Sequence, residues 1–170
     1  MKTNSHRIIA VLACLCLSLL LLGNSALQDD DKKPVRFVGK CSLEDVLKHD
    51  QEYADATFIY IPNQEAVDVF KAVSKPVTIK LFYRTDCPDS VREVPPFIKT
   101  IQLAANDNIT VEVIGVNKAK DKPADLIKGW DLRFVPTFIV VHDNKEIGRV
   151  IETAEDKIEV DLANFLKKIL

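Results

Sequence analysis

The segment from residue 77 to residue 96, VTIKLFYRTDCPDSVREVPP, carries the clearest structural signals in the chain. Its first seven residues are mostly β-branched or aromatic with few polar interruptions, which predicts a central β-strand. From Pro88 to about Ala105 the apolar residues recur at helical spacing, which predicts a helix. Cys87 is therefore expected at the N-terminus of a helix that follows directly on a buried strand.

A helix N-terminus is a favourable place for a reactive cysteine. Its unpaired backbone N–H groups and partial positive charge favour the thiolate, which is the nucleophilic form of cysteine. Asp86 and Asp89 bring negative charge to both sides of Cys87 and oppose this effect. Arg84 and Arg92 are close enough in sequence to offset the two carboxylates.

The residues from Cys87 to Ser90 have the length of a redox C-x-x-C site, with a serine in the place of the second cysteine. In a C-x-x-C site the first thiolate forms a mixed disulfide and the second cysteine resolves it. Ser90 cannot resolve a disulfide, although its hydroxyl can donate a hydrogen bond to the Cys87 thiolate. Dithiol reduction within this motif is therefore excluded.

The remaining patterns predict an α/β protein. The predicted strands are 57–61, 77–83, 109–116, 138–142 and 146–151, and the predicted helices are 42–49, about 64–73, 88–105, 125–130 and 158–170. A strand–helix–strand unit requires a parallel strand pair, and the final hairpin adds antiparallel strands. This order predicts a single mixed β-sheet with helices on both faces.

With these features the chain resembles the thioredoxin superfamily over roughly residues 57–170. Cys87 follows a central strand at the site of the first active cysteine, and Pro95 lies eight residues later, where thioredoxins carry a helix-kinking proline. The segment 134–137, FVPT, looks like the cis-proline loop of that superfamily. More narrowly, the Cys-x-Asp-Ser motif resembles thioredoxin-like proteins with a CxxS site.

This resemblance implies thiol–disulfide exchange at Cys87, with Ser90 as its neighbour in the site. It further implies that Pro136 is cis, that Val135 offers backbone groups to an extended substrate, and that further residues flank the same groove. The implied substrate-binding residues are Val135, Pro136, Thr137, Asp86 and Pro88.

The chain departs from the thioredoxin pattern at two further positions, and one of these departures fits the missing second cysteine. Asp86 stands where thioredoxins carry a tryptophan, and Leu81 stands where they carry a buried acid. The role of that acid is proton transfer with the second cysteine, so a chain without the second cysteine does not need it.

Four activities remain open from the sequence. Cys87 can act as a monothiol that an external thiol such as glutathione, or a reducing partner protein, releases. Cys41 can act as the resolving cysteine instead. The domain can bind extended client polypeptides without turnover, or Cys87 can sense peroxide through a sulfenic acid. The three histidines are scattered along the chain, so no metal site and no cofactor are predicted.

Composition and the N-terminus set the wider context. The chain has 170 residues and a formal net charge of -2, which suits one domain and argues against a nucleic-acid-binding surface. Residues 1–26 combine a basic start, an apolar run and small residues, which predicts a signal peptide and export to a bacterial periplasm. If this segment is not cleaved, it becomes a membrane anchor. Residues 27–56 are predicted to form a linker and an extension with one short helix, and residues 57–170 the thioredoxin-like domain.

Overall fold

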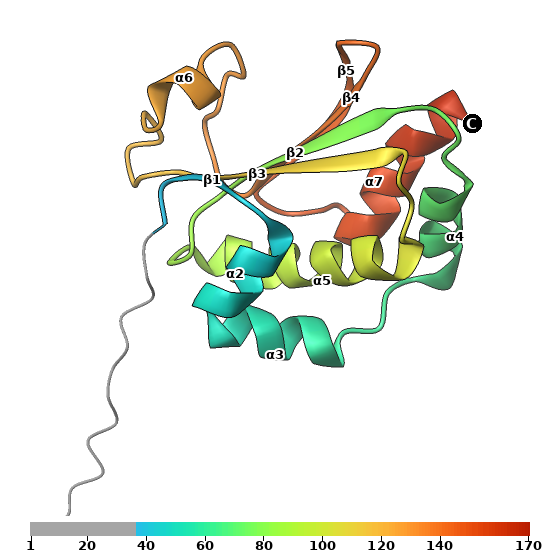
Figure 1. Ribbon diagram of the computed structural model, residues 1–170, viewed down its shortest axis with the longest axis horizontal. Coiled ribbons are helices and arrows are strands. Elements are labelled where there is room, and N and C mark those ends of the chain that lie inside the picture. Colours follow the sequence, from blue (N-terminus) through green and yellow to red (C-terminus); the bar gives the residue numbers. More distant parts are fainter. Residues whose placement is uncertain (1–36) are drawn as a thin grey trace, which may run out of the picture. The chain divides into compact units, whose positions relative to one another are not determined.

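The computed structural model describes residues 37–170, so the predicted signal peptide and most of the linker lie outside the described residues. In chain order, the elements of Figure 1 are β1 (Gly39–Cys41), α2 (Leu43–His49), α3 (Gln51–Ile59), α4 (Gln64–Ala72), β2 (Val77–Tyr83), α5 (Pro88–Ala104), β3 (Ile109–Gly115), α6 (Ala124–Ile127), β4 (Thr137–His142), β5 (Lys145–Ile151), α7 (Ile158–Leu166) and the 3-10 helix η1 (Lys167–Ile169). No helix in this part of the chain is both long enough and apolar enough to cross a membrane.

The strands form the predicted single mixed sheet, in the order β1-β3-β2-β4-β5. β2 pairs with β3 in parallel and with β4 antiparallel, and β5 follows β4 as the predicted hairpin partner. β2 is the central strand because its residues are buried on both faces, as Leu81, Phe82 and Tyr83 show in succession. The thioredoxin-like α/β fold is therefore confirmed.

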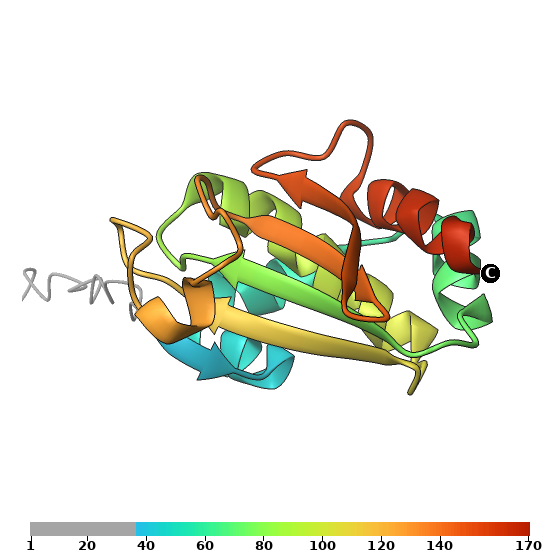
Figure 2. The same ribbon diagram turned by 90° about the horizontal axis from the view of Figure 1, so that it is seen from above.

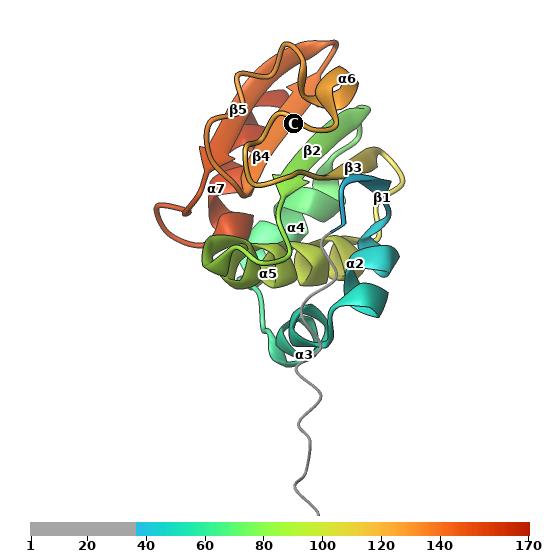
Figure 3. The ribbon, with the colours of Figure 1, turned by 90° about the vertical axis from the view of Figure 1, so that its left-hand side faces the viewer.

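The two faces of the sheet are covered unequally (Figures 2 and 3). On one face, α3, α4, α5 and α7 join a large apolar core that includes Ile79, Leu81 and Phe138. On the opposite face, the segment around α6 covers a smaller cluster centred on Phe82 and Ile114. Helices do lie on both faces, but all the long ones share one of them.

The predicted strand at residues 57–61 is wrong, because residues 57–59 end α3 and residues 60–61 belong to the loop after it. The Asp50 side chain caps α3 by accepting a hydrogen bond from the Glu52 N–H. Tyr53 and Thr57, one helical turn apart, are the two buried residues of the helix. Burial of this face outweighs the β-propensity of the Thr-Phe-Ile run.

The strand β1 was not predicted. It has three residues and pairs antiparallel with β3, where Cys41 lies opposite Val113. So short a strand leaves no periodic pattern in the sequence. The segment 27–56, expected to be a linker with one short helix, therefore also supplies an edge strand of the sheet and most of α3.

Candidate functional site

Cys87 is the N-cap residue of α5, and Pro88 occupies the first helical turn, where its missing N–H costs nothing. The Cys87 side chain makes no capping hydrogen bond. Instead, the thiol donates to the Val135 carbonyl oxygen across 3.3 Å. The residue is half-buried and packs against the apolar cluster around Phe82 and Ile114.

The carbonyl that Cys87 faces belongs to the predicted cis-proline loop. The Val135–Pro136 peptide bond is cis, as predicted. The loop leads into β4, which is antiparallel to β2. The C-terminal end of β2 therefore lies beside the N-terminal end of β4. The Thr137 hydroxyl donates to the Phe134 carbonyl oxygen at 2.8 Å and closes the turn. Residues 48 positions apart in the chain thus face each other.

A second cis bond, between Lys122 and Pro123, precedes α6 and was not predicted.

Each carboxylate next to Cys87 is paired with an arginine. Arg84 Nε lies 2.7 Å from Asp86 Oδ1, and Arg92 binds Asp89 Oδ1 at 2.8 Å. The charge compensation that the sequence suggested is therefore present. Arg92 also binds the Glu93 carboxylate at 2.9 Å, so this arginine is shared between two carboxylates.

Ser90 lies in the first turn of α5 with no exposed surface. Its hydroxyl accepts a hydrogen bond from the Arg84 N–H at 3.4 Å, so it binds the turn that carries Cys87. Donation from Ser90 to the Cys87 thiolate stays a prediction.

Tyr53, a residue that the sequence analysis missed, lies beneath the same turn. It comes from α3 in the N-terminal extension and is completely buried. Its hydroxyl donates to the Arg84 carbonyl oxygen at 3.3 Å. Burial raises the pKa of Tyr53 strongly, and negative charge on Asp50 and Cys87 acts in the same direction, whereas a hydrogen bond with Ser90 acts against it. The Asp50 cap is the one sequence signal that could have revealed this helix.

Cys41, the candidate resolving cysteine, is half-buried in β1, and its sulfur lies 3.7 Å from the Tyr83 hydroxyl. Burial raises the pKa of the Cys41 thiol, partly offset by the hydrogen bond with Tyr83. β1 is three strands away from β4, next to which Cys87 lies, which corresponds to roughly 14 Å. The structure thus does not bring the two cysteines together, and direct pairing would require movement of the backbone.

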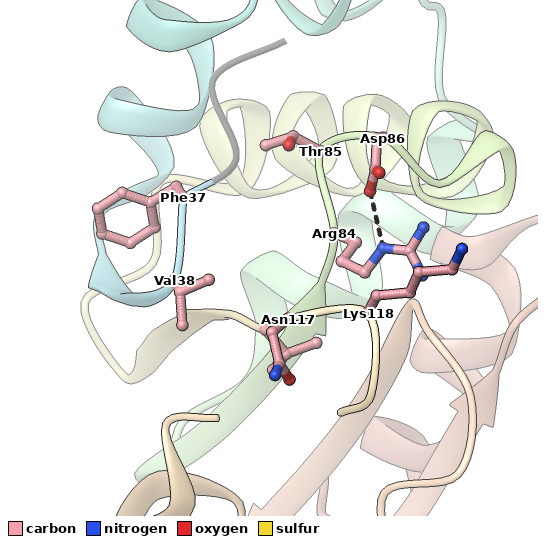
Figure 4. A pocket seen from close by; sticks show the side chains of 8 residues that line it. Phe37, Val38, Arg84, Thr85, Asp86, Asn117 and Lys118 are labelled. Atoms are coloured by element: carbon pink, nitrogen blue, oxygen red, sulfur yellow. Dashed lines mark hydrogen bonds and ion pairs between the residues drawn. The ribbon is translucent and has the colours of Figure 1, made fainter. Parts of the chain in front are cut away.

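A pocket of about 100 Å³ borders residues 84–86, which precede Cys87 (Figure 4). Phe37 and Val38 form one wall, Arg84 and Asp86 of the turn another, and Asn117 and Lys118 after β3 a third. Asp86, predicted to bind substrate, therefore lines this pocket, while Pro88 is exposed at the start of α5. The described residues contain no cluster of three or more side chains suited to a metal ion.

The strand order, the parallel central pair and the cysteine opposite a cis-proline define a thioredoxin-like α/β protein. No protein-family model matches the sequence, and no curated protein matches it significantly.

Several solved structures are similar to this chain at low sequence identity. A protein of unknown function from Pseudomonas aeruginosa is 13% identical with a TM-score of 0.50, over 75% of this chain and 83% of that one. An HIV epitope scaffold is 15% identical with a TM-score of 0.52, over 76% of this chain and 84% of that one. A mutant thioredoxin from Halobacterium salinarum is 24% identical with a TM-score of 0.42, over 64% of this chain and 87% of that one.

Proposed function

We propose that this protein performs thiol–disulfide exchange through Cys87 as a monothiol. The observation that carries the proposal is the position of the Cys87 side chain, which is half-buried at a helix N-terminus and faces the carbonyl before a cis-proline. A helix N-terminus is an environment in which cysteine nucleophiles occur, and the facing loop offers backbone groups to an extended substrate.

The exchange takes place in two balanced steps. The Cys87 thiolate attacks one sulfur of a mixed disulfide, which forms a new disulfide with Cys87 and releases the other sulfur as a thiolate that takes up a proton. An external thiolate, such as that of glutathione, then attacks the Cys87 disulfide and regenerates Cys87. The net reaction transfers the disulfide from the substrate to the external thiol.

The surrounding residues would hold the substrate and not resolve it. Val135 and Pro136 present the backbone against which an extended substrate lies, and Thr137 fixes the shape of that loop. Ser90 lacks a thiol and is buried, so the second step needs glutathione or a reducing partner protein.

From residues 1–26 we further propose export to a bacterial periplasm, or a membrane anchor if the segment is not cleaved.

The test is turnover of a glutathionylated peptide with glutathione as the second thiol. Turnover that falls to the uncatalysed rate in Cys87→Ser and persists in Cys41→Ser supports the monothiol reaction. Loss in both variants identifies Cys41 as the resolving cysteine. A wild-type protein that never exceeds the uncatalysed rate contradicts the proposal.

The second candidate is a binding module without turnover. It is favoured by two exposed apolar side chains at the cis-proline loop, Phe134 at 50% exposure and Ile151 at 44%. Ile151 pairs with Thr137 in the sheet, so it lies next to the cis-proline loop that also contains Phe134. Binding of a reduced, extended peptide that is equal in wild type and Cys87→Ser, without any turnover, would establish this function.

A further inference from the structure

At the Cys87 turn, Tyr53 from the N-terminal extension meets Arg84 and Ser90. The Arg84 N–H donates to the Ser90 hydroxyl at 3.4 Å, and the Tyr53 hydroxyl donates to the Arg84 carbonyl oxygen at 3.3 Å. The same carbonyl oxygen also accepts the Cys87 N–H at 3.3 Å. Both backbone polar groups of Arg84 are thus bound by buried hydroxyls. The Cys87 N–H shares the Arg84 carbonyl oxygen with Tyr53.

The burial of these hydroxyls makes their arrangement specific. Neither Tyr53 nor Ser90 has any exposed surface, and a buried polar group without a partner is costly. The Tyr53 ring is fixed by edge-to-face packing on Tyr83, with the ring centres 6.3 Å apart. The hydroxyl is therefore held next to the Arg84 carbonyl oxygen and the Ser90 hydroxyl.

We propose that Tyr53 is a positioning residue of the site, which acts with Ser90 to hold the Arg84–Cys87 turn so that the Cys87 thiol faces Val135. The N-terminal extension is then a functional part of the site, because α3 supplies this tyrosine. The role of the positioned thiol in catalysis rests on the function proposed above, whereas the holding of the turn does not.

The other charged groups near this site act through their electric field and are not needed to hold the Arg84–Cys87 turn. Asp50 and Glu52 of α3 lie near the Tyr53 hydroxyl, and Asp86 and Asp89 lie near Cys87, where arginines pair them. Tyr53→Phe removes one hydroxyl and changes none of these charges. Its effect therefore reports on the hydrogen bond to the turn.

The experiment measures amide hydrogen exchange in the purified protein with Tyr53→Phe. We expect the Arg84 and Cys87 amides to exchange about tenfold faster or more, while amides in the interior of β2 keep their wild-type rates. We also expect kcat/KM for the glutathionylated peptide to fall on the order of tenfold, because small displacements of a reacting group are costly. Ser90→Ala, a smaller change, should accelerate the same two amides.

Tyr60→Phe is the matched control. Tyr60 directly follows α3, but its hydroxyl donates to Glu159 in the first turn of α7 and not to the Cys87 turn. This variant loses a partly buried hydrogen bond and should leave exchange at the Cys87 turn and turnover within about twofold of wild type.

The outcomes separate this inference from the proposed function. Unchanged exchange at the turn in Tyr53→Phe, or exchange raised equally throughout the domain, overturns the positioning role even if wild-type turnover is present. If wild type shows no turnover, the proposed function is wrong, but the positioning role of Tyr53 is not affected. Whether Tyr53 holds the turn is then tested by the amide exchange rates and by the alkylation rate of Cys87, measured on the proteolytic peptide that contains Cys87.

Discussion

Ser90 replaces a resolving cysteine at a position that suits a hydroxyl. It is completely buried, it accepts the Arg84 N–H, and the Tyr53 hydroxyl lies beside it. A thiol is a weaker hydrogen-bonding group and would serve these partners less well. Leu81, which stands where thioredoxins carry a buried acid, lies wholly within the apolar core. The serine and the leucine are thus both integrated into the packing of the site.

The same scale yields a prediction for Cys41. Burial raises the pKa of its thiol above the ordinary value of 9.0, so the folded protein holds the thiol proton more tightly than the unfolded chain does. The corresponding stability is complete below the unfolded thiol pKa and is lost as pH rises through the folded pKa. We expect the free energy of unfolding of wild type to fall more steeply above about pH 8.5 than that of Cys41→Ala.

Urea denaturation at a series of alkaline pH values measures this difference. Cys41 also contributes to the raised pKa of Tyr83, so the comparison is confined to pH values below about 9.5, where the tyrosines of the unfolded chain are still largely protonated. Curves that stay parallel from neutral to alkaline pH would show that this thiol is not linked to folding.

At the level of elements, the packing of α7 on β5 depends on a glycine. A Cβ at Gly148 would lie 2.2 Å from Phe165 Cδ1, so any side chain there collides with the base of the ring. We expect Gly148→Ala to destabilise the protein by about 1–3 kcal/mol, as overpacking of a core does. Chemical denaturation measures the change.

The double variant Gly148→Ala with Phe165→Ala is the control. Because removal of the ring relieves the collision, its cost should be clearly less than the sum of the two single costs. Strictly additive costs would show that the two residues do not interact and that the helix does not lie on the strand at this point.

Helix α3 shows why one element escaped sequence-based prediction. The run Thr57-Phe58-Ile59 has strand-like composition, yet Phe58 is 81% exposed and Ile59 is 74% exposed in the structure. The buried positions are Tyr53 and Thr57 on the other side of the helix. Intrinsic propensity was outweighed by a face that packs on α5, and that contact is not visible in the local sequence.

For the whole molecule, the structure places the N-terminal extension within the core. Val46 and Tyr53 are buried in the main apolar cluster, and β1 adds an edge to the sheet. Residues 57–170, the predicted domain, would lack all three of these contributions. The boundary at Thr57 also divides α3.

We therefore predict that a chain starting at Thr57 is much less stable than one starting at Phe37. Loss of the buried Tyr53 side chain alone should cost about 3–5 kcal/mol, a large share of the stability of a domain of this size. Thermal denaturation followed by near-UV circular dichroism measures the difference. A shorter chain that melts cooperatively at the same temperature would show that the extension is dispensable.

The sequence was sufficient for the features that have a local signature. The strand β2, the cysteine at the start of α5 and the β4–β5 hairpin were predicted because periodicity, turn residues and a cysteine next to a helix start are patterns within a few residues. The cis-proline loop was predicted only from the resemblance to thioredoxins, and the structure confirms the cis bond. Only the tertiary structure could show that α3 is a helix, that β1 joins the sheet edge, that Tyr53 reaches the Cys87 turn and that Cys41 lies far from it. These depend on which surfaces pack together, and an apolar pattern shows that a face is buried without showing what covers it.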